Sequence, residues 1–164
     1  NQFGRGIALD SMGNVILTGY FRNGVTFGAI TLGGATNDSD QIFVAKLDNN
    51  GSTLWAHMYG DPPNGSIANQ QASAVAVDPS DNIIFVGQFA NKLDLGNGNP
   101  ILVKGNTDAF VAKVDKTGAN ILYAKTYGAA GSTLSATRVA VDSGGNAVFL
   151  GTFNGSVNFG FGGS

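Results

Sequence analysis

The chain has 164 residues, of which 43% are hydrophobic and only 12% are charged, with a formal net charge of −2. This length is sufficient for one domain with its own core, and the scattered cations give no basic footprint for nucleic acid or an anionic membrane surface. The sequence contains no cysteine, which excludes disulfides and thiolate metal sites, and no apolar run reaches the roughly 20 residues of a membrane-spanning helix.

The first part of the chain predicts four antiparallel strands separated by turns. Short runs of apolar and β-branched residues, bounded by Asp, Asn and Gly, are typical of strands. The strands are expected over residues 6–10, 15–21, 41–48 and 53–60. The intervening segments 11–14 and 49–51 contain Gly and Asn, which tolerate the left-handed backbone of tight hairpin turns.

The same signals return in the same order further along the chain. The run Ile7-Ala8-Leu9-Asp10 reappears at 75–78 and 139–142, and the run 43–48 reappears at 110–115. Such long-period similarity predicts a repeat architecture. We expect units at 1–68, 69–135 and 136–164, with the third incomplete. The later strands are expected over 74–78, 83–89, 109–115, 120–128, 138–142 and 147–153.

The second strand of each unit is a nearly continuous apolar run, which is typical of a strand covered on both faces. A glycine recurs within it at Gly19, Gly87 and Gly151. Glycine weakens a strand, so we expect it to mark a close approach of the neighbouring sheet. An additional short hairpin is expected between the second and third strands, and no segment has the 3.6-residue period of a helix.

These features predict an all-β fold of tandem four-stranded antiparallel β-propeller blades, forming a partial propeller of two full repeats and part of a third. The strings IALDSMGNVILTGYF, DQIFVAKLDNNGSTLWAHMYG, VAVDPSDNIIFVGQF and DAFVAKVDKTGANILYAKTYG resemble the SBBP (β-propeller) repeat family. The resemblance covers essentially the whole chain and implies secreted or surface-exposed proteins with no shared catalytic residues. Asp81, where glycine is usual, and the proline-rich segment 61–65 depart from the family pattern.

A partial propeller would expose an apolar face and a bare sheet edge at each end, which is an aggregation liability. Three arrangements remain open: a piece of a longer parent chain, an assembly with other copies, or an open array of stacked units. The expected partners are therefore other propeller blades, from the same or another chain. Glycans are an alternative, whereas nucleic acid and a membrane span are not expected.

Several acidic turns admit two interpretations. Asp10, Asp78 and Asp142 begin the first turn of each unit, where a carboxylate either accepts backbone N–H groups or binds a cation; we favour the Asx turn. The segment 48–51 is interpreted as a hairpin turn because it lacks the ligand spacing of a calcium loop. The loop 37–40 is richer in oxygen ligands, and calcium binding there stays open.

The other notable side chains are expected to be structural. His57 has no second histidine or cysteine beside it for a zinc site, so a packed or surface role is expected. Lys46 and Lys113 are interpreted as edge lysines that discourage aggregation. Trp55 and Tyr123 recur in the fourth strand, where they either pack or stack on a sugar ring as possible ligand-contact aromatics.

Function is expected to be non-enzymatic: a structural, adhesive or protein-interaction segment of a secreted or cell-surface protein. No catalytic, cofactor-binding or metal-binding residues are assigned. The alternative is a carbohydrate-binding or enzymatic propeller whose site lies in the loops 22–40 and 90–108. A second alternative is the subunit of a self-assembling filament or surface layer. Because the recurring residues fit turns and packing, function should lie in what differs between repeats or in what completes the third unit.

Overall fold

A computed structural model describes residues 1–33, 39–60, 69–96, 98–157 and 159. Every regular element in this part of the chain is a strand, which confirms the all-β prediction. The first unit contains β1 (Gln2–Leu9), β2 (Val15–Phe21), β3 (Gly24–Phe27), β4 (Ile30–Gly33), β5 (Gln41–Leu47) and β6 (Thr53–Tyr59). The second contains β7 (Gln70–Val77), β8 (Ile83–Phe89), β9 (Lys92–Leu93), β10 (Ile101–Leu102), β11 (Asp108–Val114) and β12 (Ile121–Tyr127). The third contains β13 (Thr133–Val141) and β14 (Ala147–Asn154).

The strands form two four-stranded antiparallel sheets and a hairpin. The first sheet has the order β1-β2-β5-β6, the second has the order β7-β8-β11-β12, and β13 pairs with β14. The register repeats between the sheets, since β5 pairs with β2 as β11 pairs with β8. The prediction that one antiparallel unit recurs is therefore confirmed, because both four-stranded sheets have the same strand order.

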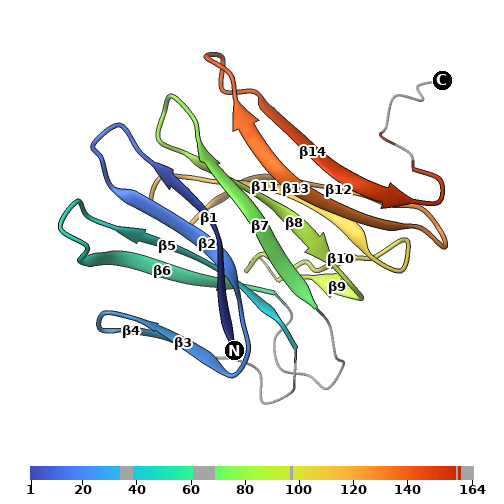
Figure 1. Cartoon of the computed structure of the whole chain (residues 1–164), viewed down its shortest axis with the longest axis horizontal. Coiled ribbons are helices and arrows are strands. Elements are labelled where there is room, and N and C mark those ends of the chain that lie inside the picture. Colours follow the sequence, from blue (N-terminus) through green and yellow to red (C-terminus); the bar gives the residue numbers. More distant parts are fainter. Residues whose placement is uncertain (34–38, 61–68, 97, 158, 160–164) are drawn as a thin grey trace.

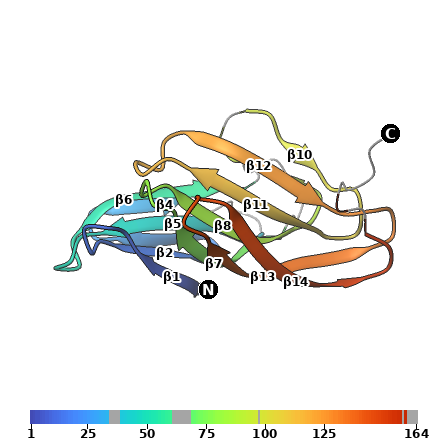
Figure 2. The same ribbon diagram turned by 90° about the horizontal axis from the view of Figure 1, so that it is seen from above.

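The first strands of the three units lie side by side, and the sheets fan outward from them (Figure 1). β1 contacts β7, and β7 contacts β13 on its other side. Viewed from above, the sheets form successive layers, with β13 and β14 beside the second sheet (Figure 2). Two cores fill the spaces between these layers. No helix in the described residues is long and apolar enough to cross a membrane.

Strand β8 shows how one strand serves both cores. Phe85 belongs to the core against the first sheet, whereas Ile84 and Val86 belong to the core against β13 and β14. All three side chains are fully buried. Burial on both faces, which the continuous apolar run predicts, is thus confirmed for β8. In β14 the same run alternates between half-buried and exposed residues, because only one of its faces is covered.

The additional hairpin of each full unit is β3–β4 or β9–β10. These hairpins pack on the sheets: the Phe27 ring lies 5.1 Å from the Phe43 ring, and Leu93 and Leu95 are buried in the first core. In the third unit, Phe159 lies 6.0 Å from the Tyr127 ring. The predicted extra hairpin is confirmed, and it contributes to the packing between units.

The first strands are longer than the short segments that the sequence predicts, and each contains a register shift typical of a β-bulge. The shifts fall between Gly4 and Gly6 in β1, between Ala72 and Ala74 in β7, and between Ala136 and Arg138 in β13. β13 already begins at Thr133, before the start of the third unit expected at 136.

The recurring glycine of the second strand faces the bulged first strand of its own sheet. A Cβ atom on Gly19 would lie 1.9 Å from the carbonyl oxygen of Phe3, and one on Gly87 would lie 1.9 Å from that of Gln71. Gly151 has the same relation to Ser135, at 2.1 Å. The expectation that a neighbouring sheet makes this close approach was wrong, because the bulge itself brings the backbone so near.

Gly87→Ala should lower the free energy of unfolding by about 3 kcal/mol, because the methyl group must displace backbone that is held by pairing. Gly4→Ala is the matched control, since a Cβ there meets nothing within 4 Å. Urea denaturation followed by circular dichroism measures both. Equal stability of the two variants would contradict the proposed role of the glycine.

Candidate functional site

An aspartate closes the turn between the first two strands of every unit. Asp10 Oδ1 accepts hydrogen bonds from the backbone N–H groups of Met12 and Asn14, at 2.9 and 2.8 Å. Its Oδ2 accepts from the Asn14 amide at 2.8 Å. Asp78 and Asp142 make equivalent bonds in their own turns. The Asx-turn interpretation is therefore confirmed in all three units.

A lysine from the third strand completes this arrangement in the two full units. Lys46 Nζ lies 2.8 Å from Asp10 Oδ2, and Lys113 Nζ lies 2.6 Å from Asp78 Oδ2. The lysine side chains are only 11% and 14% exposed. The prediction of edge lysines was wrong, because β5 and β11 are interior strands with a neighbour on each side. Each lysine therefore connects the third strand of its unit to the turn that follows the first strand of the same unit.

The surroundings of these aspartates shift their pKa values in a defined direction. Burial acts to raise the pKa of Asp78, but hydrogen bonds from Lys113 and Asn82 outweigh it and lower the pKa to about 2. Burial likewise acts to raise the pKa of Asp10, but hydrogen bonds from Lys46 and Asn14 outweigh it and lower the pKa well below its usual range. Asp142 is exposed and has a pKa lowered chiefly by Asn146.

The depressed pKa of Asp78 predicts a specific loss of stability in acid. A carboxylate whose pKa is lower in the folded state stabilises the fold above its unfolded value of 3.8, and this contribution is lost as pH falls toward about 2. Asp78→Asn should therefore lower the melting temperature at neutral pH and flatten its decline between about pH 4 and pH 2. Thermal melts at a series of pH values test this.

Asp142→Asn provides the matched control, because Asp142 makes the same turn but is exposed and has no lysine partner in the described part of the chain. It should change the acid profile less than Asp78→Asn does. If Asp78→Asn and the unaltered protein lose stability in parallel below pH 4, the ion pair with Lys113 does not govern acid stability.

The turns of the three units meet around a hollow of about 410 Å³ at one end of the first strands. Asp81, the residue that departs from the family pattern, accepts hydrogen bonds from the Ser11 backbone N–H at 2.8 Å and from its hydroxyl at 2.7 Å. This contact links the turns of the first two units. Among the described residues, no three His, Cys, Asp or Glu side chains are grouped closely enough to hold a metal ion.

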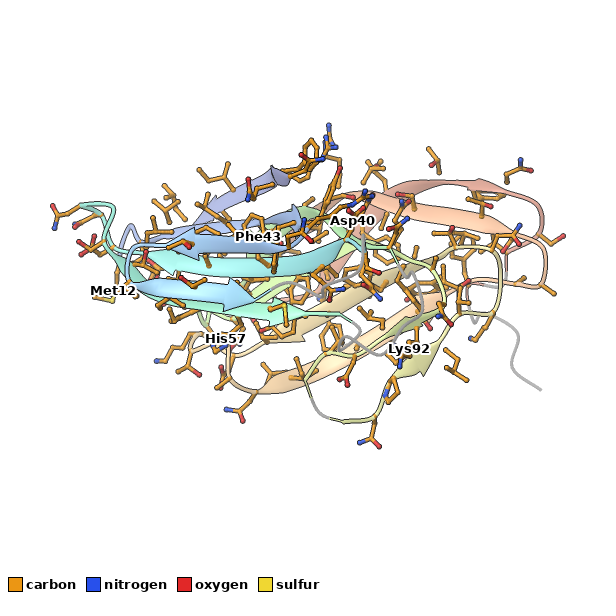
Figure 3. All side chains as sticks on the ribbon, turned by 90° about the horizontal axis from the view of Figure 1, so that it is seen from below. Met12, Asp40, Phe43, His57 and Lys92 are labelled. Carbon is orange, nitrogen blue, oxygen red and sulfur yellow. The ribbon has the colours of Figure 1, made fainter. Side chains whose placement is uncertain are left out.

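The loop 37–40 is only partly described, since residues 37 and 38 lie outside the described residues. Asp40 is buried, forms an ion pair with Arg22 and accepts a hydrogen bond from Gln71 Nε2 at 2.5 Å. Figure 3 shows Asp40 and Met12 at opposite ends of the first sheet. Because Gln71 belongs to β7, Asp40 connects the first and second sheets.

The two candidate aromatic residues do not form one site. Trp55 is in β6 and packs against the first core, with its ring 5.2 Å from that of His57. Tyr123 is in β12 and packs against the second core, with Lys113 Nζ 6.0 Å from its ring centroid. The His57 ring also lies 6.4 Å from the Tyr59 ring, so His57 is half-buried and packs between two aromatic rings, which is one of the two roles that the sequence predicts.

A second hollow, of about 420 Å³, lies between the first strands and was not predicted from the sequence. Its lining is polar and includes no carboxylate: Gly4, Arg5, Tyr20, Gln71, Ser73, Gln88, Ser135, Thr137 and Arg138. We call it the axial hollow. Each of the three bulges places a different residue in it, namely Arg5, Ser73 or Thr137. The available signal was that positions 5, 73 and 137 are equivalent in the repeat but differ in chemistry.

The guanidinium groups of the axial hollow have neutral partners. Arg5 donates a hydrogen bond to the Tyr20 hydroxyl at 2.9 Å, and its guanidinium carbon lies 5.4 Å from the Tyr20 ring centroid. Arg138 donates to the Thr137 carbonyl at 2.8 Å. Both arginines are exposed, and neither has a carboxylate partner among the described residues. The hollow is thus a cationic site in a chain whose net charge is −2.

The outer faces of the first and third units carry exposed apolar side chains. We define the N-terminal face by Ile7 and Leu9 on β1, which are 69% and 62% exposed. We define the C-terminal face by Val148 and Leu150 on β14, which are 65% and 61% exposed. The strands that carry these faces, β1 and β14, belong to the units at opposite ends of the row (Figure 1).

No family model matches the chain, but it has a distant similarity to a repeat-containing protein. An alignment of 124 positions, which covers 69% of the chain, is 32% identical to an uncharacterized WD repeat-containing protein of Acanthamoeba polyphaga mimivirus. The chain spans only 9% of the length of that relative. Together with the repeated antiparallel sheets, the similarity suggests a β-propeller-type repeat family.

Proposed function

We propose that the chain is a non-enzymatic scaffold segment of a β-propeller protein of the SBBP repeat type, with a structural, adhesive or protein-interaction role. Each four-stranded sheet corresponds to one blade, and β13–β14 corresponds to the first half of a third. The order of the sequence motifs and the distant repeat-containing relative support this proposal. The low charge content of 12% supports a secreted or cell-surface location.

One observation carries the proposal: each end face repeats a surface that is buried inside the molecule. Ile7 on the N-terminal face is equivalent to Val75, which is 7% exposed because the first sheet covers it. Val148 on the C-terminal face is equivalent to Ile84, which is fully buried. The two end faces therefore correspond to the two sides of the contact that buries one sheet against the next. A further blade could cover each of them in the same way.

Joining the C-terminal face of one copy to the N-terminal face of another would reproduce the internal packing. Such a contact uses different surfaces on the two copies, so it extends into a ring or an open array. The blades that cover these faces can come from the same polypeptide or from other copies. The second of these sources corresponds to the filament or surface-layer subunit that the sequence also predicts.

A site in the loops 22–40 and 90–108 has less support. In these segments, β3–β4 and β9–β10 pack on the sheets and contribute Phe27, Leu93 and Leu95 to buried contacts. Residues 34–38 and 97 lie outside the described residues. The separation of Trp55 and Tyr123 on different sheets gives no shared surface on which one sugar could stack.

Light scattering tests whether the end faces pair. The chain should associate as its concentration rises, giving masses above its 16.7 kDa. The double variants Ile7→Thr/Leu9→Thr and Val148→Thr/Leu150→Thr should each be predominantly monomeric, because each lacks one apolar face. Their equimolar mixture should form dimers and nothing larger, since each variant retains the face that the other has lost.

Leu102→Thr is the control for the light-scattering experiment, because Leu102 is an equally exposed strand residue outside both faces, at 67%. Its self-association should match that of the unaltered chain. A chain that stays monomeric at every concentration, or association that both double variants retain, would refute pairing through these faces.

A second candidate function, binding of an anionic ligand, is favoured by the axial hollow. Arg5 and Arg138 line it together with hydroxyl and amide groups, and no carboxylate of the lining neutralises them. Guanidinium groups bind carboxylates through charge-assisted hydrogen bonds. The three bulges supply the site from the positions at which the repeats differ, as expected for a ligand-specific surface on a repeated scaffold.

Titration calorimetry with citrate tests the axial hollow. Arg5→Gln and Arg138→Gln should each weaken citrate binding about tenfold, the effect of removing one charge-assisted hydrogen bond. Lys125→Gln should leave it unchanged, because Lys125 is an exposed cation of β12 that does not line the hollow. Equal weakening by all three substitutions would indicate nonspecific charge attraction and would exclude the site.

A further inference from the structure

Strand β14 differs from its counterparts in having a free edge. β2 pairs with both β1 and β5, and β8 pairs with both β7 and β11. In the described part of the chain, β14 pairs with β13 alone. Its second edge therefore presents unpaired backbone donors and acceptors, which are a template for a further strand.

The two full units fix the register that such a strand would adopt. Phe43 of β5 stands opposite Gly19 of β2, and Phe110 of β11 stands opposite Gly87 of β8. Gly151 is the equivalent residue of β14, because it faces the bulge of β13 as the other two glycines face theirs. A phenylalanine of an added strand would stand opposite Gly151.

The space that this phenylalanine would occupy is open and apolar. A hollow of about 280 Å³ lies beside Gly151, with Phe149 and Phe153 in its lining. In the full units, the equivalent rings contact the inserted phenylalanine: Phe85 lies 5.8 Å from Phe110, and Phe21 lies 6.4 Å from Phe43. The hollow therefore lies where a phenylalanine equivalent to Phe43 and Phe110 would pack.

The turn of the β13–β14 hairpin carries the negative charge of Asp142, which a lysine of the added strand could pair with. Three residues after the phenylalanine, Lys46 and Lys113 reach the turn aspartates of their units. Asp142 has the same hydrogen bonds from its turn, with Oδ1 accepting from Gly144 and Asn146, yet it is exposed. A lysine three residues beyond the phenylalanine would reach Asp142 in the same way.

We propose that the free edge of β14 binds an extended partner strand of the type Phe-x-x-Lys, antiparallel to β14, with its phenylalanine opposite Gly151 and its lysine paired with Asp142. This inference rests on the proposed scaffold role and names the partner of the C-terminal end. The β5 and β11 strands of a second copy do not fit as partners, because both of their edges are already paired.

The test uses a fluorescein-labelled peptide with the sequence of residues 40–48, Asp-Gln-Ile-Phe-Val-Ala-Lys-Leu-Asp, added to the 164-residue chain. Fluorescence anisotropy should show saturable binding with one peptide per chain. Hydrogen–deuterium exchange should show new protection in residues 147–154. Replacing the peptide phenylalanine with alanine should weaken binding at least tenfold, because a buried aromatic anchor is lost.

A double-mutant cycle tests the predicted ion pair. Asp142→Asn in the chain and methionine in place of lysine in the peptide should each weaken binding about tenfold, and the two changes together should weaken it little further. Asp115→Asn is the matched control, because Asp115 forms an exposed turn of the same kind at a different hairpin. It should leave peptide affinity unchanged.

Backbone pairing is tested with two N-methylated peptides. One is methylated at the odd-numbered residues and the other at the even-numbered residues, which gives two frames. Only the frame whose N–H groups face β14 should lose binding, because alternate residues of a strand direct their N–H groups to opposite edges. The inference would be overturned if the peptide showed no saturable binding, or if both methylation frames lost binding equally. It would also be overturned by additive effects in the double-mutant cycle, or by protection at the edge strands β6 or β12 in place of β14. Failure of the peptide to bind a chain whose end faces still associate would refute this inference alone.

Discussion

The constraint on which this structure depends is that its sheets are apolar on both faces. A sheet of this kind is stable only between two neighbours, because burying apolar surface is the main favourable term in folding. The second sheet satisfies this condition, with Phe85 facing one core and Ile84 and Val86 facing the other. The first sheet and the β13–β14 hairpin satisfy it on one side, which leaves Ile7 and Val148 exposed at the two ends. The surfaces available for interaction therefore follow from the repeat itself.

Within each sheet, the aspartate–lysine pair supplies what apolar packing lacks, namely a fixed register. A slip by one residue would exchange the two faces of a strand, which costs little when both faces are apolar. Lys113 can reach Asp78 only when β11 lies in one register on β8. A buried pair of charges gains little net stability after desolvation, but separating its members is costly. The pair thus favours one register over its alternatives, and it gives β14, through Asp142, a means of selecting its partner.

Sequence periodicity was sufficient to predict the strands, the turn aspartates and the extra hairpins, because these depend on local pattern and turn chemistry. It was insufficient for contacts between strands that are distant in the chain. Lys46 was expected at a sheet edge, whereas it lies on the interior strand β5 and pairs with Asp10. The sequence does not reveal this pairing because it depends on the order of the strands in the sheet. Gly19 was expected to meet another sheet, since the bulge at Arg5 leaves no recognisable signal in the sequence. Trp55 and Tyr123 occupy equivalent positions in two units, but the sequence alone does not show which core each ring packs against.

The same bulges explain how a repeated scaffold can acquire a specific site. A bulge inserts one residue that has no partner in the ladder, so the identity of that residue is free of pairing requirements. In the first strands, which lie side by side, three such residues converge on the axial hollow as Arg5, Ser73 and Thr137. Positions that maintain the sheets, such as Gly87 and Asp78, must recur in every unit, whereas these three can differ without cost to the fold. Variation at these three positions therefore falls at one place on the molecule, where side chains from every unit can contact one ligand.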